Sequence, residues 1–130
     1  SEEEMNIVKQ EKGRITLFSD HEIKNDLYKG KSWSKKCDEI IKNLPKNVYI
    51  SFDIDGLEPS LCPNTGTPVP GGFKLEDVTF LLEKIVLSGR KIIGFDLCEV
   101  VPEEDGDEWD GNVGARILYK LCLLTLKSQK

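Results

Sequence analysis

Apolar and polar residues recur along the chain with two different periods, which predicts strands and helices in turn. Residues 47–55 alternate strictly, a pattern typical of a strand with one buried face. The apolar positions of this run are Val48, Ile50, Phe52 and Ile54, and the alternate positions are Tyr49, Ser51, Asp53 and Asp55. Two shorter runs, residues 14–19 and 91–97, are rich in strand-forming residues and predict two further strands.

Helical spacing of apolar residues follows the strand-like runs. The first helix is expected from Ser34, capped by Ser32 or Ser34 and stopped by Pro45. Its apolar stripe is Trp33, Cys37, Ile40, Ile41 and Leu44. A second helix has Leu75, Val78, Leu81, Leu82, Ile85 and Val86 on one side and closes at Gly89.

The remaining segments predict two more helices and a polar loop. A last helix is expected after the acidic loop 101–111, capped by Asn112 or Asp110. Its inward residues are Val113, Ile117, Leu118, Leu121, Cys122 and Leu124. Residues 4–11 predict a short helix that ends near Gly13, and residues 20–32 predict a polar loop with a short helical turn.

Alternation of strands and helices predicts an α/β protein with parallel strands. Right-handed crossovers would place the helices on the faces of the sheet, giving a three-layer α/β/α fold. In such sheets the chemistry lies beyond the carboxyl ends of the strands. Two acidic groups fall at those ends in this sequence.

Asp53 and Asp55 form the first acidic group, at the end of the strongest strand and directly before Gly56. Residues two apart on a strand point the same way, so we expect these carboxylates to repel each other unless a cation lies between them. Carboxylate oxygens suit Mg²⁺ or Mn²⁺. An isolated Asp-x-Asp is more often a solvated loop start, but the buried run before it and the glycine turn after it favour the metal interpretation.

Asp96 and Glu99 form the second acidic group, at the end of the run 91–97. Three residues apart, they do not share a strand face; Glu99 would face the mouth of the sheet and Asp96 would lie deeper. The spacing equally fits a turn cap at Asp96 and a solvated Glu99, and it does not decide between the two.

Residues 56–73 form a proline- and glycine-rich loop between the strongest strand and the next helix. A long loop within a compact domain is usually functional, and its hydroxyls and Asn64 are plausible substrate contacts. A rigid connector remains the alternative interpretation.

Composition narrows the possibilities further. The chain has 130 residues, enough for one domain, and its net charge of −5 argues against nucleic-acid binding. No apolar run approaches the roughly 20 residues that span a bilayer, and no signal peptide is evident. The four widely spaced cysteines predict reduced, partly buried thiols in a cytoplasmic protein. A start at Ser1 predicts a piece of a longer, processed or engineered chain.

Three motifs together resemble the C-terminal part of the ureohydrolase superfamily, which includes arginases, agmatinases, formimidoylglutamases and guanidinobutyrases. The first motif spans residues 51–59 (SFDIDGLEP) and 62–72 (CPNTGTPVPGG). The second is residues 94–102 (GFDLCEVVP), and the third is residues 110–116 (DGNVGAR). The resemblance covers residues 47–126 and implies that residues 1–130 are the C-terminal segment of an arginase-like domain.

The resemblance implies roles for four residues. Asp53 would bridge two Mn²⁺ ions, and Asp55 would bind one of them. Thr67 and Glu99 would lie at the guanidinium end of the substrate, with Glu99 as the catalytic residue that counters its positive charge. The implied reaction is metal-assisted hydrolysis of a small guanidino or formimino compound, releasing urea from a guanidino substrate, by an enzyme that is homo-oligomeric when complete.

The chain departs from the family pattern upstream of these motifs. The other metal ligands of the family come from a G-G-D-H-type motif and a D-A-H-x-D motif, and neither is present. His21 matches neither motif, and we expect it to be a surface residue. Two carboxylates cannot complete the six-ligand environment of Mn²⁺, so the segment alone is predicted to be inactive.

Two other classes of function remain open. The segment could be an inactive binding or regulatory module derived from the same fold. A Mg²⁺-dependent phosphotransfer domain is a weaker alternative, because Gly71 and Gly72 lack the spacing of a phosphate-binding helix start. Arginine, agmatine and formimidoylglutamate are not distinguished as substrates by these residues.

Overall fold

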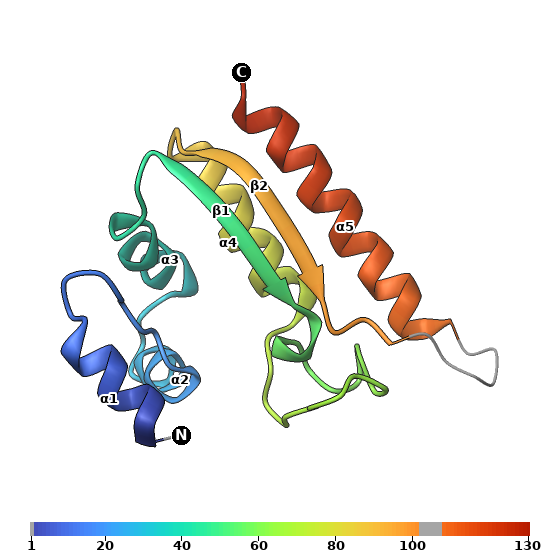
Figure 1. Cartoon of the computed structure of the whole chain (residues 1–130), viewed down its shortest axis with the longest axis horizontal. Coiled ribbons are helices and arrows are strands. Elements are labelled where there is room, and N and C mark those ends of the chain that lie inside the picture. Colours follow the sequence, from blue (N-terminus) through green and yellow to red (C-terminus); the bar gives the residue numbers. More distant parts are fainter. Residues whose placement is uncertain (1, 102–107) are drawn as a thin grey trace. The chain divides into compact units, whose positions relative to one another are not determined.

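The computed structural model describes residues 2–101 and 108–130, which divide into two compact units. The first unit, Ser1–Asn43, contains α1 (Glu2–Gln10), α2 (Asp20–Tyr28) and α3 (Trp33–Lys42). The second, Leu44–Lys130, contains β1 (Asn47–Asp53), a 3₁₀ helix (Ile54–Gly56), α4 (Leu75–Leu87), β2 (Lys91–Cys98) and α5 (Trp109–Ser128) (Figure 1). Most of the predicted acidic loop, residues 102–107, lies outside the described residues.

Two predictions for the first unit are wrong. Residues 14–19 form no strand, because the described part of this unit has no other strand with which their backbone could pair. Residues 20–32 are mostly helical rather than looped: the Ser19 hydroxyl accepts a hydrogen bond from the backbone N–H of Glu22 and so caps α2. The predicted cap of α3 is confirmed, with Ser32 accepting from Lys35.

A buried lysine joins α2 to α3 in the first unit. The Lys36 side chain is 1% exposed, and its ammonium lies 3.0 Å from a Glu22 carboxylate oxygen and 2.9 Å from Asp26. Hydrogen bonds from Lys31 and Lys36 lower the pKa of Asp26 from 3.8 to about 2. These contacts supply the partners that a buried charge requires, so they stabilise the helix pair.

Strands β1 and β2 form a parallel pair in the second unit, as the alternating pattern predicted. Ser51 pairs with Asp96, and Asp53 pairs with Cys98 at the carboxyl end. The register shifts once, between Val48 and Tyr49, where β2 carries one extra residue. The parallel α/β class is therefore confirmed.

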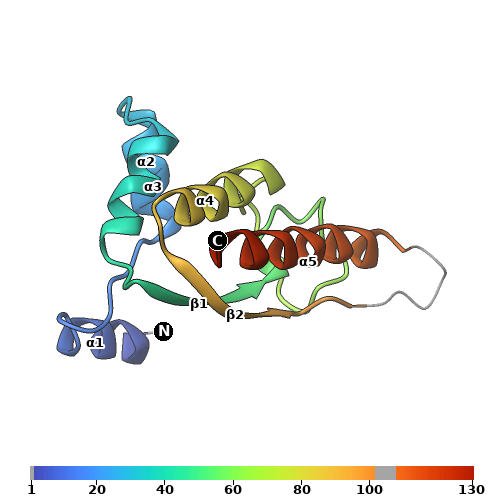
Figure 2. The same cartoon turned by 90° about the horizontal axis from the view of Figure 1, so that it is seen from above.

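Helices α4 and α5 lie on one side of the two strands (Figure 2). Each turns a row of apolar residues inward, at the three- and four-residue spacing that one helix face requires. The buried apolar side chains of these two helices and the strands are Leu82, Ile85, Val113, Ile117, Leu121, Leu124, Val48 and Ile92. This packing fixes the direction of both strands, so that both carboxyl ends lie at the same edge (Figure 1).

All four cysteines are free thiols; Cys37 and Cys62 are buried, whereas Cys98 and Cys122 are exposed. The prediction of reduced, partly buried thiols is thus confirmed. None of the helices in the described residues is long and apolar enough to cross a membrane.

Candidate functional site

The carboxyl ends of the two strands bring the predicted acidic residues to one edge of the second unit. Asp53 ends β1 opposite Cys98, and Glu99 directly follows β2. The side chains of Asp53 and Glu99 are exposed, whereas Asp55 is half-buried. The parallel pairing of the two strands therefore brings Asp53 and Glu99 to the same edge, as expected.

Asp55 does not continue the alternation of β1, and the expected strand geometry for the Asp53–Asp55 pair is wrong. The strand ends at Asp53, and Ile54–Gly56 form a 3₁₀ turn. The turn buries Ile54 completely, which a strand continuing past the sheet would not do. Asp53 and Asp55 are therefore positioned by a strand end and by a turn, respectively.

A three-residue segment of the loop, Thr65–Thr67, contacts both acidic groups. The Thr67 hydroxyl donates a short hydrogen bond to the Asp55 carboxylate. The buried Thr65 hydroxyl donates to the main-chain carbonyl of Glu99 over 3.0 Å. Gly66 lies between them, and a Cβ atom at this position would be 3.3 Å from Glu99 Oε2. The loop thus joins the end of β1 to the end of β2.

The base of this loop is closed by backbone contacts. Glu58 donates to the carbonyl of Phe73 over 2.9 Å, and Phe73 donates to the carbonyl of Gly56 over 3.0 Å. A Cβ atom on Gly72 would lie 2.2 Å from the carbonyl oxygen of Leu57. Only glycine allows the two backbone segments to approach this closely.

Gly72→Ala is therefore expected to destabilise the second unit by about 1–3 kcal/mol, because the opposing atom is backbone and cannot rotate away. Gly111→Ala is the matched control: a Cβ atom on Gly111 meets nothing within 4 Å, and alanine favours the helix. Urea unfolding of both variants measures the difference. Equal stability of the two variants would show that the loop base is not closely packed.

The first turn of α5 anchors the same loop. Asp110 is fully buried and accepts hydrogen bonds from the backbone N–H and the side-chain amide of Asn64, at 3.1 and 3.3 Å. The Trp109 indole N–H donates to the carbonyl of Ser60 over 2.9 Å. The predicted cap at Asn112 or Asp110 is wrong, because α5 begins at Trp109, preceded by Glu108, which makes no side-chain capping bond.

Sequence reasoning did not identify Asp110 as a residue that organises the site. Its sequence signals were the motif 110–116, which begins with it, and its place as an acid at the start of a helix, which is equally typical of a cap. Asn64, which the sequence offered as a plausible substrate contact, donates its side-chain amide to Asp110. Both residues fix the loop that carries Thr65 and Thr67.

Asp96 lies on the exposed face of the strand pair and is held by its neighbours. Ser51 donates to its carboxylate over 2.8 Å, and this hydrogen bond is the main reason that the pKa of Asp96 is lowered. The thiol of Cys98 also faces Asp96, at 3.4 Å. Asp96 is thus a paired strand residue and not a turn cap.

Negative charge gathers at this edge, as its effect on Cys98 shows. The hydrogen bond to Asp96, partial burial and the nearby charges of Asp53 and Glu99 together raise the pKa of this thiol. A raised pKa favours the protonated thiol, which is the less reactive form of cysteine. An accumulation of anionic groups favours a cationic ligand at this edge.

Two residues at this edge could supply part of the donor set of a metal site. Asp53 and Asp55 supply hard oxygen donors of the kind that Mg²⁺ and Mn²⁺ prefer. Among residues 2–101 and 108–130, no three His, Cys, Asp or Glu side chains are placed to hold a metal ion. The donor chemistry fits, but further ligands are needed.

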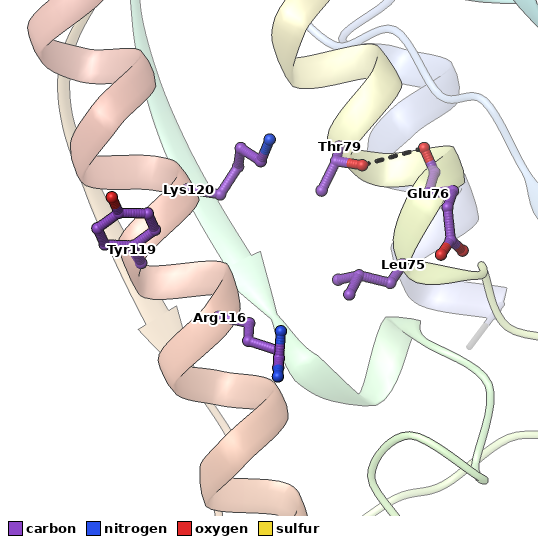
Figure 3. Close-up of a pocket in the computed structure, with 6 residues that line it drawn as sticks. All are labelled: Leu75, Glu76, Thr79, Arg116, Tyr119 and Lys120. Carbon is purple, nitrogen blue, oxygen red and sulfur yellow. Dashed lines mark hydrogen bonds between the residues drawn. The ribbon is translucent and has the colours of Figure 1, made fainter.

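A groove also lies between α4 and α5 (Figure 3). Its volume is about 290 Å³, and none of Asp53, Asp55, Thr67 or Glu99 lines it. The lining residues are Leu75, Glu76, Thr79, Arg116, Tyr119 and Lys120. Lys120 is paired with Glu83 and Arg116 with Asn112, so both cations already have partners.

Comparisons with known proteins relate this chain to one family. The arginase family model matches residues 1–124. An N(1)-aminopropylagmatine ureohydrolase from Thermus thermophilus is 40% identical over 88 residues, covering 68% of this chain and 27% of that protein. An agmatinase from Neisseria meningitidis is 38% identical over 90 residues, covering 69% of this chain and 28% of that protein.

Solved structures agree with the sequence comparison. Arginase from Bacillus subtilis superposes with a TM-score of 0.75 at 26% identity, covering 93% of this chain and 40% of the arginase. Proclavaminate amidino hydrolase from Streptomyces clavuligerus superposes with a TM-score of 0.72 at 28% identity, covering 88% of this chain and 36% of that protein. The chain thus spans less than half of the length of each of these relatives.

Proposed function

The chain belongs to the arginase family, and we propose that it supplies the C-terminal part of the active site of a manganese-dependent ureohydrolase. The substrate would be a small guanidino or formimino compound. In this proposal residues 1–130 form the C-terminal segment of the domain, and the remaining metal ligands come from the part of the domain that this chain does not cover.

The observation that supports the proposal most strongly is the contact of one loop segment with both acidic strand ends. Thr67 donates to Asp55, and Thr65 donates to the main chain of Glu99. A rigid connector between β1 and α4 would need neither contact. A site that must hold a metal ion and a cationic group side by side needs both carboxylates in fixed positions.

Asp53 and Asp55 are proposed as metal ligands, with Asp53 shared between two manganese ions and Asp55 binding one. The hydrogen bond from Thr67 uses part of the acceptor capacity of the Asp55 carboxylate. This bond would also fix the orientation of the lone pairs that remain for a metal ion. When bound, a pair of divalent ions supplies Lewis-acid activation of water at neutral pH.

Glu99 is proposed as the residue that receives the positively charged end of the substrate. A guanidinium that leaves water needs a charged partner, and a carboxylate can accept two parallel hydrogen bonds from it. Thr67, two residues beyond the main-chain contact to Glu99, is proposed to contact the same end of the substrate. These two residues would orient the carbon that is attacked.

Residues 1–130 alone are expected to show no measurable urea release from arginine or agmatine with Mn²⁺ present, because two carboxylates do not complete the coordination. A colorimetric urea assay checks this, with the same residues joined to the remaining part of the family's domain as the positive control. Turnover by the isolated segment at rates typical of enzymes would contradict the proposed division of the ligands.

The protein in which residues 1–130 are joined to the remaining part of the family's domain, called the joined protein below, also tests the proposed activity itself. Arginine, agmatine and formimidoylglutamate are each assayed with Mn²⁺, and release of urea from the first two or of formamide from the third supports the proposal. Manganese binding without turnover of any of the three would favour an inactive binding or regulatory module. Cytoplasmic location and homo-oligomeric assembly stay predictions.

A further inference from the structure

Glu99 has an unusual backbone. Its φ angle is +64°, and it is the one residue other than glycine with a positive φ in the part of the chain that the structure describes. A side chain in this left-handed region is in steric conflict with its own carbonyl, so the conformation persists only where the surroundings hold it. The outlier lies at the end of β2, where the proposed substrate-binding carboxylate begins.

The position of Val100, the residue after Glu99, shows the structural consequence of this conformation. Val100 packs against the first turns of α5, where a Cβ atom on Gly114 would lie 3.1 Å from its methyl groups. Glu99 thus makes the turn after β2 that brings Val100 against α5. Its carboxylate is left exposed at the strand ends, with Oε2 3.3 Å from the place that a Cβ atom on Gly66 would occupy.

Thr65 provides a specific restraint on that turn. Its side chain is 5% exposed, and its hydroxyl donates to the carbonyl oxygen of Glu99 over 3.0 Å, across 34 residues of sequence. The backbone N–H of Thr65 donates to the carbonyl of Cys62, so the main chain that carries this hydroxyl is itself restrained. Loss of the hydroxyl would leave the carbonyl of Glu99 without this donor and the strained conformation without this restraint.

We propose that Thr65 is a positioning residue that holds the main chain of Glu99 in the left-handed conformation and thereby aims the Glu99 carboxylate. The substrate-related part of this inference rests on the proposed function, whereas the conformational part does not. Thr65 touches neither metal nor substrate in this proposal and acts only through Glu99.

The conformational part is tested on the chain itself by NMR. A strong nuclear Overhauser effect between the amide and α protons of the same residue marks a positive φ. We expect this signal at Glu99 in the wild type and in Thr65→Ser, which keeps the hydroxyl, and its loss in Thr65→Val and Thr65→Ala. Thr79→Val, which removes a hydroxyl bonded to the carbonyl of Glu76, is the control and should keep it.

A left-handed Glu99 in both folded Thr65→Val and folded Thr65→Ala would overturn the proposal. If valine prevents folding, as judged by dispersion of the amide spectrum, the smaller alanine variant decides the question. These outcomes do not depend on whether the protein is an enzyme.

The substrate-related part is tested in the joined, manganese-loaded protein with agmatine or whichever of the three substrates it hydrolyses. Thr65→Val should lower kcat/KM on the order of 10–100-fold, as a small misplacement of a binding group does, with manganese content unchanged and most activity kept in Thr65→Ser. Full activity in Thr65→Val would overturn the positioning role. If the unmutated protein hydrolyses none of the substrates, the proposed function fails while the NMR result still decides the role of Thr65.

Discussion

Replacing Asp53 with alanine in the joined protein is expected to abolish binding of both manganese ions and to lower activity on the order of a thousandfold or more. Asp53 ends β1 at the edge where the two acidic groups meet, and its side chain is exposed toward solvent. A carboxylate shared by two ions holds both, so its removal weakens both sites together. Calorimetric titration of Mn²⁺ and metal analysis of the same sample measure the effect.

Asp55→Ala is the matched comparison, because it removes a carboxylate only two residues away. Thr67 already uses part of the acceptor capacity of Asp55, and Asp55 is proposed to bind one ion only. The variant should therefore weaken one manganese site and leave the other measurable. Loss of a single ion to the same extent in both variants would contradict the sharing role of Asp53.

Glu99→Gln is expected to reduce kcat/KM by an amount equivalent to about 2–5 kcal/mol while leaving manganese occupancy intact. Glutamine has nearly the same shape and can still accept one hydrogen bond, but it no longer balances the charge of a desolvated guanidinium. Steady-state kinetics with the metal content measured on the same sample separate the two effects.

Glu76→Gln provides the matched control for this variant. Glu76 is an exposed carboxylate on α4 that lines the groove between α4 and α5, apart from the strand ends. It should leave both kinetics and metal content unchanged. Should Glu99→Gln lose its manganese, Glu99 would be a metal ligand; should it keep full activity and metal, it would be a solvated loop residue.

Local patterns were sufficient to predict the strands and helices of the second unit of this chain. The strict alternation through Val48 and Phe52 predicts β1, because only a strand places every second residue in a core. The helical stripes through Leu82 and Val113 likewise predict the helices that cover it. Since parallel strands must share an edge for their carboxyl ends, the meeting of Asp53 and Glu99 followed from the order of elements alone.

Most of the wrong predictions concern partners that are distant in the sequence; the missed helix α2 is an exception, because its cap at Ser19 is local. Residues 14–19 have strand-forming composition, but the described part of their unit provides no strand to pair with. Asp55 leaves the alternation because Ile54 turns inward to fill the core. Asp110 looks like a cap in sequence, and only the fold brings Asn64 to it across 46 residues.

The left-handed backbone of Glu99 was equally invisible to pattern analysis. Residues that adopt a positive φ are usually glycine or asparagine, so a glutamate gives no local signal of it. The conformation depends on Thr65, which lies 34 residues earlier in the chain. Contacts of this kind form only in the folded protein and have no local signal in the sequence.

Anomalous X-ray diffraction at the manganese absorption edge, on crystals of the joined protein grown with Mn²⁺, tests the central claim most directly. The proposed function predicts two anomalous peaks at the carboxyl end of β1, both within coordination distance of the Asp53 carboxylate and one also bound by Asp55. Glu99 should lie outside the coordination shell of both ions. Peaks outside coordination distance of Asp53 would contradict the proposal. So would the absence of any peak near the carboxyl end of β1 in a protein that releases urea.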